Sequence, residues 1–401
     1  MNSVLISGAG VAGPALAYWL RHYGFAPTVV ERAPAPRAGG QAIDLRGTAR
    51  EVARRMGVLD QVRAAHTGAR GMAFVNAAGK RTSTMASDAL GDSGGVIAEL
   101  EILRGDLVRI LHEATDSGVE YAFGDRITSL TQTDTGVRAT FERAAPRTFD
   151  LVIGADGLHS GVRSLVFGPE SRFAHDLGAY ICVFGTTQRD DLDGWQLMHT
   201  VPGRTAGLYP LPGGEANAMF VFASPPLEHD RRDTAWQRNV VATTFADDGW
   251  EVPRLLGDLS QAPDFYFDRL SQIRMDSWSD GRVALLGDAA FCASPMAGNG
   301  TSMALVGAYV LAGELATAPD HTTAFRRYEE VMREYVRRCQ KFALGGVDSL
   351  MPKSRMFIRM RDFSLRVVPH LPGGARLFGD LQKLASTVSL QDYRGRSLTS
   401  S

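Results

Sequence analysis

The sequence is poor in cysteine, with only Cys182, Cys292 and Cys339, which lie far apart and form no Cys-x-x-Cys pair. This spacing excludes a disulfide framework and a zinc site, and a reducing cytoplasm is the expected location. No run of about 20 apolar residues occurs, and no basic segment precedes the first apolar run, Val4-Leu5-Ile6. We therefore expect neither export nor insertion into a membrane.

An excess of charge of one sign is also lacking. Lysine and arginine together number 43, aspartate and glutamate 44, and the net charge is −1. Such a chain has no global field that attracts nucleic acid or an acidic membrane, so we expect a small-molecule partner. What the chain does have is 401 residues, 44% of them hydrophobic and 22% charged. These values indicate a globular protein of two or three domains.

Residues 1–35 show the pattern of a strand, a helix and a second strand. The apolar run Val4 to Ser7 leads into Gly8-Ala9-Gly10-Val11-Ala12-Gly13, a helix-forming stretch follows, and Pro27 to Val30 is apolar again. The glycines permit a tight turn and let the backbone approach a pyrophosphate at the positive end of the helix. Glu31 stands where an acidic side chain accepts hydrogen bonds from a ribose. The alternative is a glycine turn that only packs a helix on a sheet.

Two further segments place an aspartate directly after an apolar strand. Residues 151–163 contain Gly154-Ala155-Asp156-Gly157, and residues 283–290 contain Gly287-Asp288. Ligands of open α/β folds bind at the carboxyl ends of strands, so both carboxylates indicate a ligand site. The glycine-rich loop from Pro295 to Gly300 then leads into a helix whose N-terminus can stabilise negative charge. Taken singly, each aspartate could instead cap a helix or form a turn.

The rest of the chain alternates predicted strands and helices. We expect a hairpin around residues 76–79, a helix at 103–117, strands at 136–143 and 149–153, an antiparallel sheet at 178–223 and a helix at 301–317. From Phe325 onward the sequence predicts amphipathic helix, interrupted near Gly345-Gly346, Pro352 and Pro369. The charges from Arg355 to Arg366 are interpreted as a solvated helix face.

In order and spacing, the three segments resemble the GxGxxG, Asp-Gly and Gly-Asp motifs of the class A flavoprotein monooxygenases, typified by para-hydroxybenzoate hydroxylase. The resemblance covers residues 1–330. Residues 39–46 (Gly-Gly-Gln-Ala-Ile-Asp-Leu-Arg) and 101–107 (Glu-Ile-Leu-Arg-Gly-Asp-Leu) are most similar to tetracycline-inactivating and aromatic polyketide monooxygenases. The implied fold is α/β, with a Rossmann-like FAD-binding domain interleaved with a mostly antiparallel β-sheet substrate domain, plus C-terminal helices.

The resemblance also implies domain boundaries and FAD contacts. The FAD-binding domain would comprise residues 1–72, 100–175 and 275–330, the substrate domain 73–99 and 176–274, and a bracing helical segment 331–401. Glu31 would bind the adenosine ribose, and Asp156 and Gly157 are associated with both FAD and the nicotinamide nucleotide. The residues implied to bind FAD non-covalently are Gly8, Gly10, Ala12, Gly13, Glu31, Arg32, Asp44, Leu45, Arg46, Arg104, Asp156, Gly157, Gly287, Asp288, Pro295, Gly298, Gly300, Thr301 and Ser302.

Substrate contacts would come from the sheet of the second domain. Gln196, Met219 and Val221 fall where pocket residues would lie, and Pro295 and Met296 could form the floor on the flavin side. Core packing is the alternative for Met219 and Val221. Because the strands around them are apolar, we expect an uncharged aromatic or polycyclic substrate. The apolar residues on which this expectation depends are Tyr180, Phe184, Leu208, Phe220 and Phe222.

By the same resemblance, NADPH or NADH reduces FAD, and the reduced flavin takes up O2 as a C4a-hydroperoxide. One oxygen atom then passes to the substrate. The flavin carries the chemistry, so no protein nucleophile is assigned, and His159, His199 and His229 are taken as structural or surface residues. Three positions depart from the family pattern: Phe291, commonly His; Ser302, often Asn; and Gly307, commonly acidic. They bear on flavin movement and substrate contact.

Other functions are compatible with parts of this pattern. A flavin-dependent halogenase would need a Trp-x-Trp-x-Ile-Pro sequence, and no two tryptophans here stand two residues apart. A reductase or oxidase of the same fold would keep all three motifs and differ in how it treats O2. A non-catalytic flavin-binding protein would bind FAD without substrate-dependent NAD(P)H oxidation. The sequence leaves the last two open and does not indicate an oligomeric state.

Overall fold

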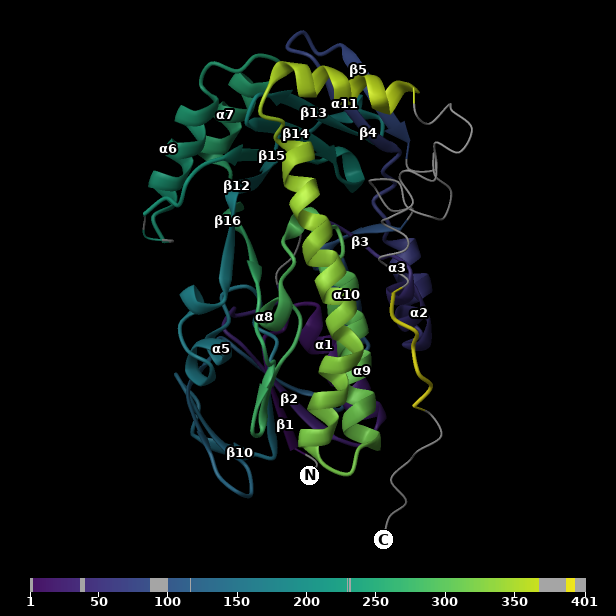
Figure 1. Ribbon diagram of the computed structural model, residues 1–401, viewed down its shortest axis with the longest axis vertical. Helices are drawn as coiled ribbons and strands as arrows, with labels where there is room; N and C mark the ends of the chain where they lie inside the picture. The colour runs from purple at the N-terminus through teal and green to yellow at the C-terminus, as the bar shows by residue number, and fades with distance from the viewer. Residues whose placement is uncertain are drawn as a thin grey trace.

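The computed structural model describes residues 3–36, 40–86, 100–115, 117–228, 230, 232–367 and 387–393. Gly39, His229 and Pro369 lie outside these ranges. Figure 1 shows an elongated molecule with one sheet toward each end and two long helices beside each other along one side. Within the described ranges, no helix is both long and apolar enough to cross a membrane.

The lower sheet in Figure 1 has six strands in the order β17-β18-β11-β1-β2-β7. They are β1 (Ser3–Ser7), β2 (Ala26–Glu31), β7 (Glu120–Phe123), β11 (Leu151–Gly154), β17 (Ser279–Asp280) and β18 (Val283–Leu285). All neighbours pair in parallel except β17 with β18. The helix α1 (Ala12–His22) connects β1 to β2, so the predicted strand-helix-strand unit is confirmed. The strands that precede the three motif segments, β1, β11 and β18, are neighbours in this sheet.

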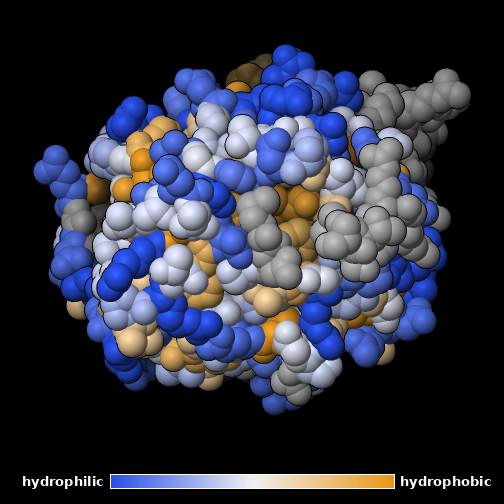
Figure 2. All heavy atoms as spheres, turned by 90° about the horizontal axis from the view of Figure 1, so that it is seen from below, coloured by the Kyte–Doolittle hydropathy of each residue, from blue (hydrophilic) through white to orange (hydrophobic). Residues whose placement is uncertain are grey.

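Among the helices around this sheet, α9 contacts α1, α2 and α10. Small residues let α9 be buried on almost all sides, and every residue from Ser302 to Ala316 is buried. The helices of this part are α2 (Thr48–Arg55), α3 (Leu59–Ala64), α4 (Arg104–Glu113), α5 (Gly161–Val166), α8 (Asp288–Phe291), α9 (Gly300–Thr317) and α10 (His321–Leu350). There are two smaller sheets. One pairs β3 (Ala42–Asp44) with β6 (Glu101–Leu103), and the other has β9 (Val137–Phe141) between β8 (Ile127–Gln132) and β10 (Arg147–Phe149). Figure 2 views this end, where hydrophilic residues predominate and apolar residues form separate groups.

The upper sheet has seven strands in the order β16-β12-β15-β14-β13-β4-β5. They are β4 (Gly71–Val75), β5 (Arg81–Ala86), β12 (Ala174–Thr186), β13 (Trp195–Val201), β14 (Arg204–Pro210), β15 (Ala216–Ala223) and β16 (Phe265–Ile273). All neighbours pair antiparallel except β13 with β4. The prediction of a mostly antiparallel second sheet is therefore confirmed, as is the β4–β5 hairpin.

The two faces of the upper sheet pack against different partners, and this corrects one expectation. One face packs on α6 (Thr234–Phe245) and α7 (Val252–Gln261). It carries the apolar residues that were expected around the substrate, namely Tyr180, Phe184, Leu208, Phe220 and Phe222. These side chains form a core on the far side of the sheet. The other face carries Ile181, Val183, Met219 and Val221 and packs toward the motif loops and α10.

The C-terminal helices differ from the prediction in three ways. Gly345-Gly346 does not interrupt α10, and the boundary placed at residue 330 falls inside this helix. The helix ends just before Pro352, as predicted. In α11 (Arg355–Val367) the charges are not all solvated. The Arg361 guanidinium lies 3.7 Å from the ring centroid of Phe74, whereas four large apolar side chains are exposed. The exposed apolar residues of α11 are Met356, Phe357, Met360 and Phe363.

Candidate functional site

The three motif segments meet at the N-terminus of α1. A Cβ atom on Gly8 would lie 2.6 Å from the backbone oxygen of Ala155 in the second segment. One on Gly287, in the third segment, would lie 3.2 Å from the Cβ of Ala12. Within the first segment, a Cβ on Gly13 would lie 1.9 Å from the backbone oxygen of Gly8. Glycine is therefore needed at positions 8 and 13 for backbone to approach backbone, and at position 287 for a φ of 66°.

Two helix N-termini at the site lack a side-chain cap. Neither α1 nor α9 has a capping hydrogen bond from its N-cap side chain or an acidic residue in its first turn. Their unpaired N–H groups and helix dipoles favour an anionic ligand. Arg104 is exposed, and its Nη2 would lie 3.5 Å from a Cβ on Gly10, which is itself partly exposed. This arrangement can bind phosphate.

The end of β2 carries Glu31, whose carboxylate is held by the backbone. Its Oε2 accepts a hydrogen bond from the Ala9 N–H at 2.9 Å, and its Oε1 accepts one from the Ala33 N–H at 2.8 Å. Glu31 therefore fixes the glycine turn as well as standing where a ribose is expected. The neighbouring Arg32 is exposed.

A second group of predicted residues gathers around the loop that precedes α9. A Cβ on Gly298 would lie 3.9 Å from Asp44 Oδ2, and one on Gly300 the same distance from Asp288 Oδ1. Arg46 pairs with Asp44 at 2.7 Å, and its backbone N–H donates to Ser302 Oγ at 3.3 Å. The sequence segments 44–46, 287–288 and 295–302 are thus brought together.

This loop is strained and has a defined lining. Ser294, which precedes the 3₁₀ turn Pro295–Ala297, has a φ of 78°, a conformation that costs a non-glycine residue of the order of 1 kcal/mol or more. Pro295 is exposed and Thr301 partly exposed, so both are accessible to a ligand. The side chain of Leu45 is 1% exposed and packs in the core, which leaves only its backbone for a cofactor.

The two predicted aspartates differ in their surroundings. Asp156 accepts hydrogen bonds from Ser7 Oγ, Ser160 Oγ and the N–H groups of Gly161 and Val162. Its carboxylate therefore holds the start of α5, as the helix-capping alternative states, and the neighbouring Gly157 is partly exposed. The side chain of Asp288 reaches solvent, but protein atoms lie around it on most sides. This enclosure raises the pKa of Asp288, and the positive charge of Arg104 opposes the rise.

The sheet register places the predicted substrate residues on the face toward this loop. Met198, Gly207 and Met219 lie opposite one another on β13, β14 and β15, and Gln196 shares their face by alternation. Met219 is half-buried and groups with Met296. Val221 is 0% exposed, so core packing, the alternative reading, applies to it.

Two residues were missed by the sequence analysis. Tyr266, on β16, is 41% exposed, and its hydroxyl donates to Asp268 Oδ2 at 3.4 Å. Enclosure by protein, followed by the charge of Asp268, raises the pKa of Tyr266. Glu101 is buried on β6, opposite Asp44 on β3. No strand was predicted at β16, and Glu101 stood in residues 101–107 without a role assigned to it.

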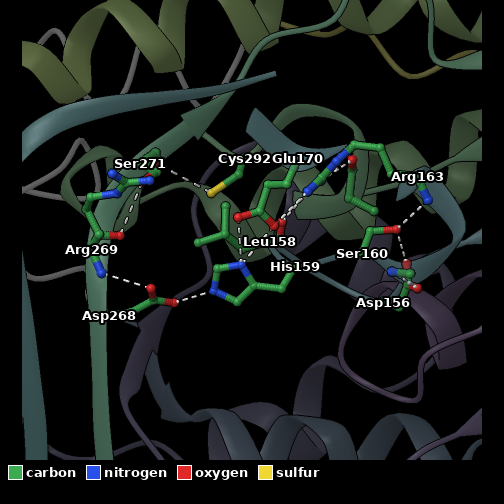
Figure 3. Close-up of polar contacts among 12 residues, drawn as sticks. Asp156, Leu158, His159, Ser160, Arg163, Glu170, Asp268, Arg269, Ser271 and Cys292 are labelled. Carbon is green, nitrogen blue, oxygen red and sulfur yellow. Dashed lines mark hydrogen bonds and ion pairs between the residues drawn. The ribbon is translucent and has the colours of Figure 1, made fainter. Parts of the chain in front are cut away.

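The Asp-Gly segment is joined to the upper sheet by the polar network in Figure 3. His159 Nδ1 lies 2.9 Å from Glu170 Oε2, and His159 Nε2 lies 2.9 Å from Asp268 Oδ2 on β16. Burial alone would lower the pKa of His159, but the two carboxylates outweigh it and raise the pKa to about 8. A protonated His159 thus links the two sheets at neutral pH.

Two of the departures from the family pattern are neighbours. A Cβ on Gly307 would lie 2.9 Å from the side chain of Leu286 and 3.5 Å from that of Phe291. Phe291 is 1% exposed, with its ring centroid 4.7 Å from that of Trp278. The side chains of Leu286 and Phe291 therefore pack directly against Gly307, and positions 291 and 307 belong to one apolar cluster.

Gly346, on α10, lies against the loop that precedes α9, and its neighbour Gly345 provides a matched control. A Cβ there would lie 2.8 Å from the backbone oxygen of Met296, whereas one on Gly345 would meet nothing within 4 Å. We expect Gly345→Ala to stabilise the protein by about 0.5–1 kcal/mol through helix propensity. Gly346→Ala should destabilise it by about 1–3 kcal/mol and weaken cofactor retention. Thermal unfolding and bound-flavin content check both; equal effects of the two variants would contradict the contact.

Comparison with known proteins gives consistent matches along the chain. A family model described as FAD binding domain matches residues 1–347. An uncharacterized protein of Mycobacterium tuberculosis is 47% identical over 398 residues, which cover 98% of this chain and 100% of that protein. A flavin-dependent monooxygenase from an unknown prokaryotic organism is 42% identical over 395 residues, covering 98% and 99%. The crystal structures of tetracycline destructases Tet(51) and Tet(55) both have a TM-score of 0.82, with 34% and 37% identity, and cover 98% and 97% of this chain and 99% and 98% of theirs.

Proposed function

We propose that this protein, which belongs to the FAD binding domain family of flavin-dependent monooxygenases, oxygenates an aromatic polycyclic compound of the tetracycline type. The reaction would consume NAD(P)H and O2. The observation that supports this best is the convergence of the three motif segments below the sheet face that carries Met219 and Gln196. That convergence supports a single site that combines a dinucleotide-binding turn with a candidate substrate surface.

The residues present fit FAD. The close backbone contacts at Gly8 and Gly13 leave Gly10 partly exposed beside the uncapped start of α1, which suits a pyrophosphate. Arg104 would neutralise phosphate charge, and Glu31 would hold the ribose. Asp288 would bind the ribityl chain, and the uncapped start of α9 would stabilise negative charge on the reduced ring. When bound, FAD supplies hydride acceptance from NAD(P)H and the activation of O2.

The substrate class is proposed from two features. The relatives Tet(51) and Tet(55) are named tetracycline destructases. The sheet face toward the loop combines apolar side chains, Met198 and Met219, with the polar Gln196 and Asn217. A polycyclic compound with hydrogen-bonding groups along one edge would match this combination.

The expectation of a reducing compartment is supported by the three cysteines, all of which are free and buried.

The test uses the FAD-loaded protein, NADPH or NADH, and isotopically labelled O2. Tetracycline and a panel of polycyclic phenols are offered, and the products are followed by mass spectrometry. We expect one labelled oxygen atom in the product and NAD(P)H oxidation that is faster when that compound is present. Hydrogen peroxide as the only product with every compound would contradict the proposal.

A variant pair locates the substrate site. We expect Met219→Lys to lower substrate-stimulated NAD(P)H oxidation about tenfold or more, because it places a charge against an apolar ligand. The content of bound FAD should be unchanged. Met360→Lys, on the exposed face of α11, serves as the matched control and should leave turnover unchanged. Equal loss of FAD and turnover in Met219→Lys would indicate core packing instead.

A further inference from the structure

A buried carboxyl group lies where the two halves of the site meet. Glu101, on β6 of the FAD-binding part, is 7% exposed. Its Oε2 accepts a hydrogen bond from Gln196 Nε2, on β13 of the upper sheet, at 3.2 Å. Its Oε1 accepts one from Thr67 Oγ1 at 2.6 Å. Glu101 thus joins a candidate substrate residue to the strand pair that carries Asp44.

We propose that Glu101 is a positioning residue that fixes which end of the Gln196 amide faces the substrate. The inference rests on the proposed function, because it takes Gln196 as a substrate contact. A glutamine amide has a donating end and an accepting end, and the partner of one end decides which remains for a ligand. With Nε2 committed to the Glu101 carboxylate, Gln196 offers Oε1, a hydrogen-bond acceptor. The substrate group at this place is therefore a donor, such as a phenolic hydroxyl or an amide N–H.

Protonation of Glu101 would reverse this arrangement. A protonated carboxyl group can donate to Gln196 Oε1, which leaves the NH2 group for the substrate. Burial, followed by the negative charge of Asp44, raises the pKa of Glu101 to about 7, although Thr67, Gln196 and Arg46 oppose the rise. Both states are therefore populated near neutral pH.

The groups that face Glu101 come from every element around it. Asp44 stands opposite it on β3 and pairs with Arg46 at 2.7 Å. Tyr209 on β14 is buried, and the charge of Glu101 contributes to its raised pKa, after burial itself. The backbone N–H of Thr67 donates to the Glu101 carbonyl at 2.9 Å, and the neighbouring His66 is exposed. The only positive side chain among these described groups, Arg46, is already paired with Asp44.

The kinetic test is a double-mutant cycle with tetracycline as the probe. We expect the wild-type KM to fall about three- to tenfold from about pH 6 to about pH 8, as the acceptor becomes available. Glu101→Gln should abolish this pH dependence with little change in kcat, because Glu101 touches no reacting atom. In the Gln196→Leu background, Glu101→Gln should have no further effect on KM. Additive effects, or a change confined to kcat, would overturn the proposal.

Thr67→Val is the control that should shift the pKa of Glu101 while the hydrogen bond between Glu101 and Gln196 stays in place. The Thr67 hydroxyl lowers the pKa of Glu101, so its loss should shift the midpoint of the KM profile to higher pH. A pH dependence that persists in Glu101→Gln would belong to tetracycline itself and would count against the proposal.

Infrared titration of the FAD-loaded protein decides the matter independently of the substrate. We expect a protonated-carboxyl band that disappears as the pH rises through about 7, is absent from Glu101→Gln, and shifts in Gln196→Leu. Its absence from the wild type would refute the inference even if tetracycline is oxygenated. A wild type that oxygenates none of the compounds while showing this coupled band would instead refute the proposed function.

Discussion

Gly13→Ala is expected to yield a protein that retains no FAD and unfolds at a temperature several degrees lower. The added Cβ would lie 1.9 Å from the backbone oxygen of Gly8, and no side-chain rotation relieves a clash with backbone. Either α1 moves away from β1 or the turn opens, at a cost of about 3 kcal/mol. Both movements displace the N–H groups at the start of α1. Thermal unfolding and the flavin-to-protein absorbance ratio after gel filtration measure the two effects.

Gly10→Ala is the matched control within the same motif. Its Cβ would meet only Arg104 Nη2, at 3.5 Å, an ordinary contact. We therefore expect the FAD-free protein to be as stable as the wild type. Affinity for FAD should fall about ten- to hundredfold, because the methyl group would stand where we propose that the pyrophosphate approaches the backbone. If Gly10→Ala destabilised the FAD-free protein as much as Gly13→Ala, the two glycines would not have the separate roles assigned here.

Features that depend on local sequence were predicted well. The turn at Gly8 to Gly13 follows an apolar strand and precedes a helix, so its structure is determined within about ten residues of chain. The same holds for the β4–β5 hairpin and for α9. The three motif strands were expected to end at one site, and β1, β11 and β18 are indeed neighbours in the sheet.

Features that depend on distant contacts were not predicted. Alternation shows that Phe220 and Val221 lie on opposite faces of β15, but not which face packs on α6 and α7. Gly345-Gly346 was expected to interrupt a helix. The structural role of Gly346 comes from its contact with Met296, which is far away in the sequence and gives no local signal. Glu101 acquires its importance from Gln196 and Asp44 together. These relations arise only when the two sheets are assembled.

Arg163 carries the second large effect, because it holds two motif segments together from a fully buried position. It is 0% exposed and donates to the backbone oxygens of Leu158 at 2.6 Å and Ala289 at 2.9 Å, as well as to Glu170 Oε2 at 3.1 Å. Leu158 follows the Asp-Gly segment, and Ala289 follows Asp288. Figure 3 shows that the same Glu170 also binds His159.

We expect Arg163→Met to destabilise the protein by about 3–5 kcal/mol, because it leaves two carbonyl groups without this buried donor and Glu170 with His159 as its remaining partner. Retention of FAD should also fall, since both motif segments lose an anchor. Arg172→Leu, at an exposed arginine two residues after Glu170, should cost about 0.5 kcal/mol or less. Adding Glu170→Gln to Arg163→Met should not recover the loss, because the Glu170 carboxylate remains paired with His159 in the single variant. Urea unfolding of the three variants measures these differences, and a loss in Arg163→Met no larger than in Arg172→Leu would show that the anchor is dispensable.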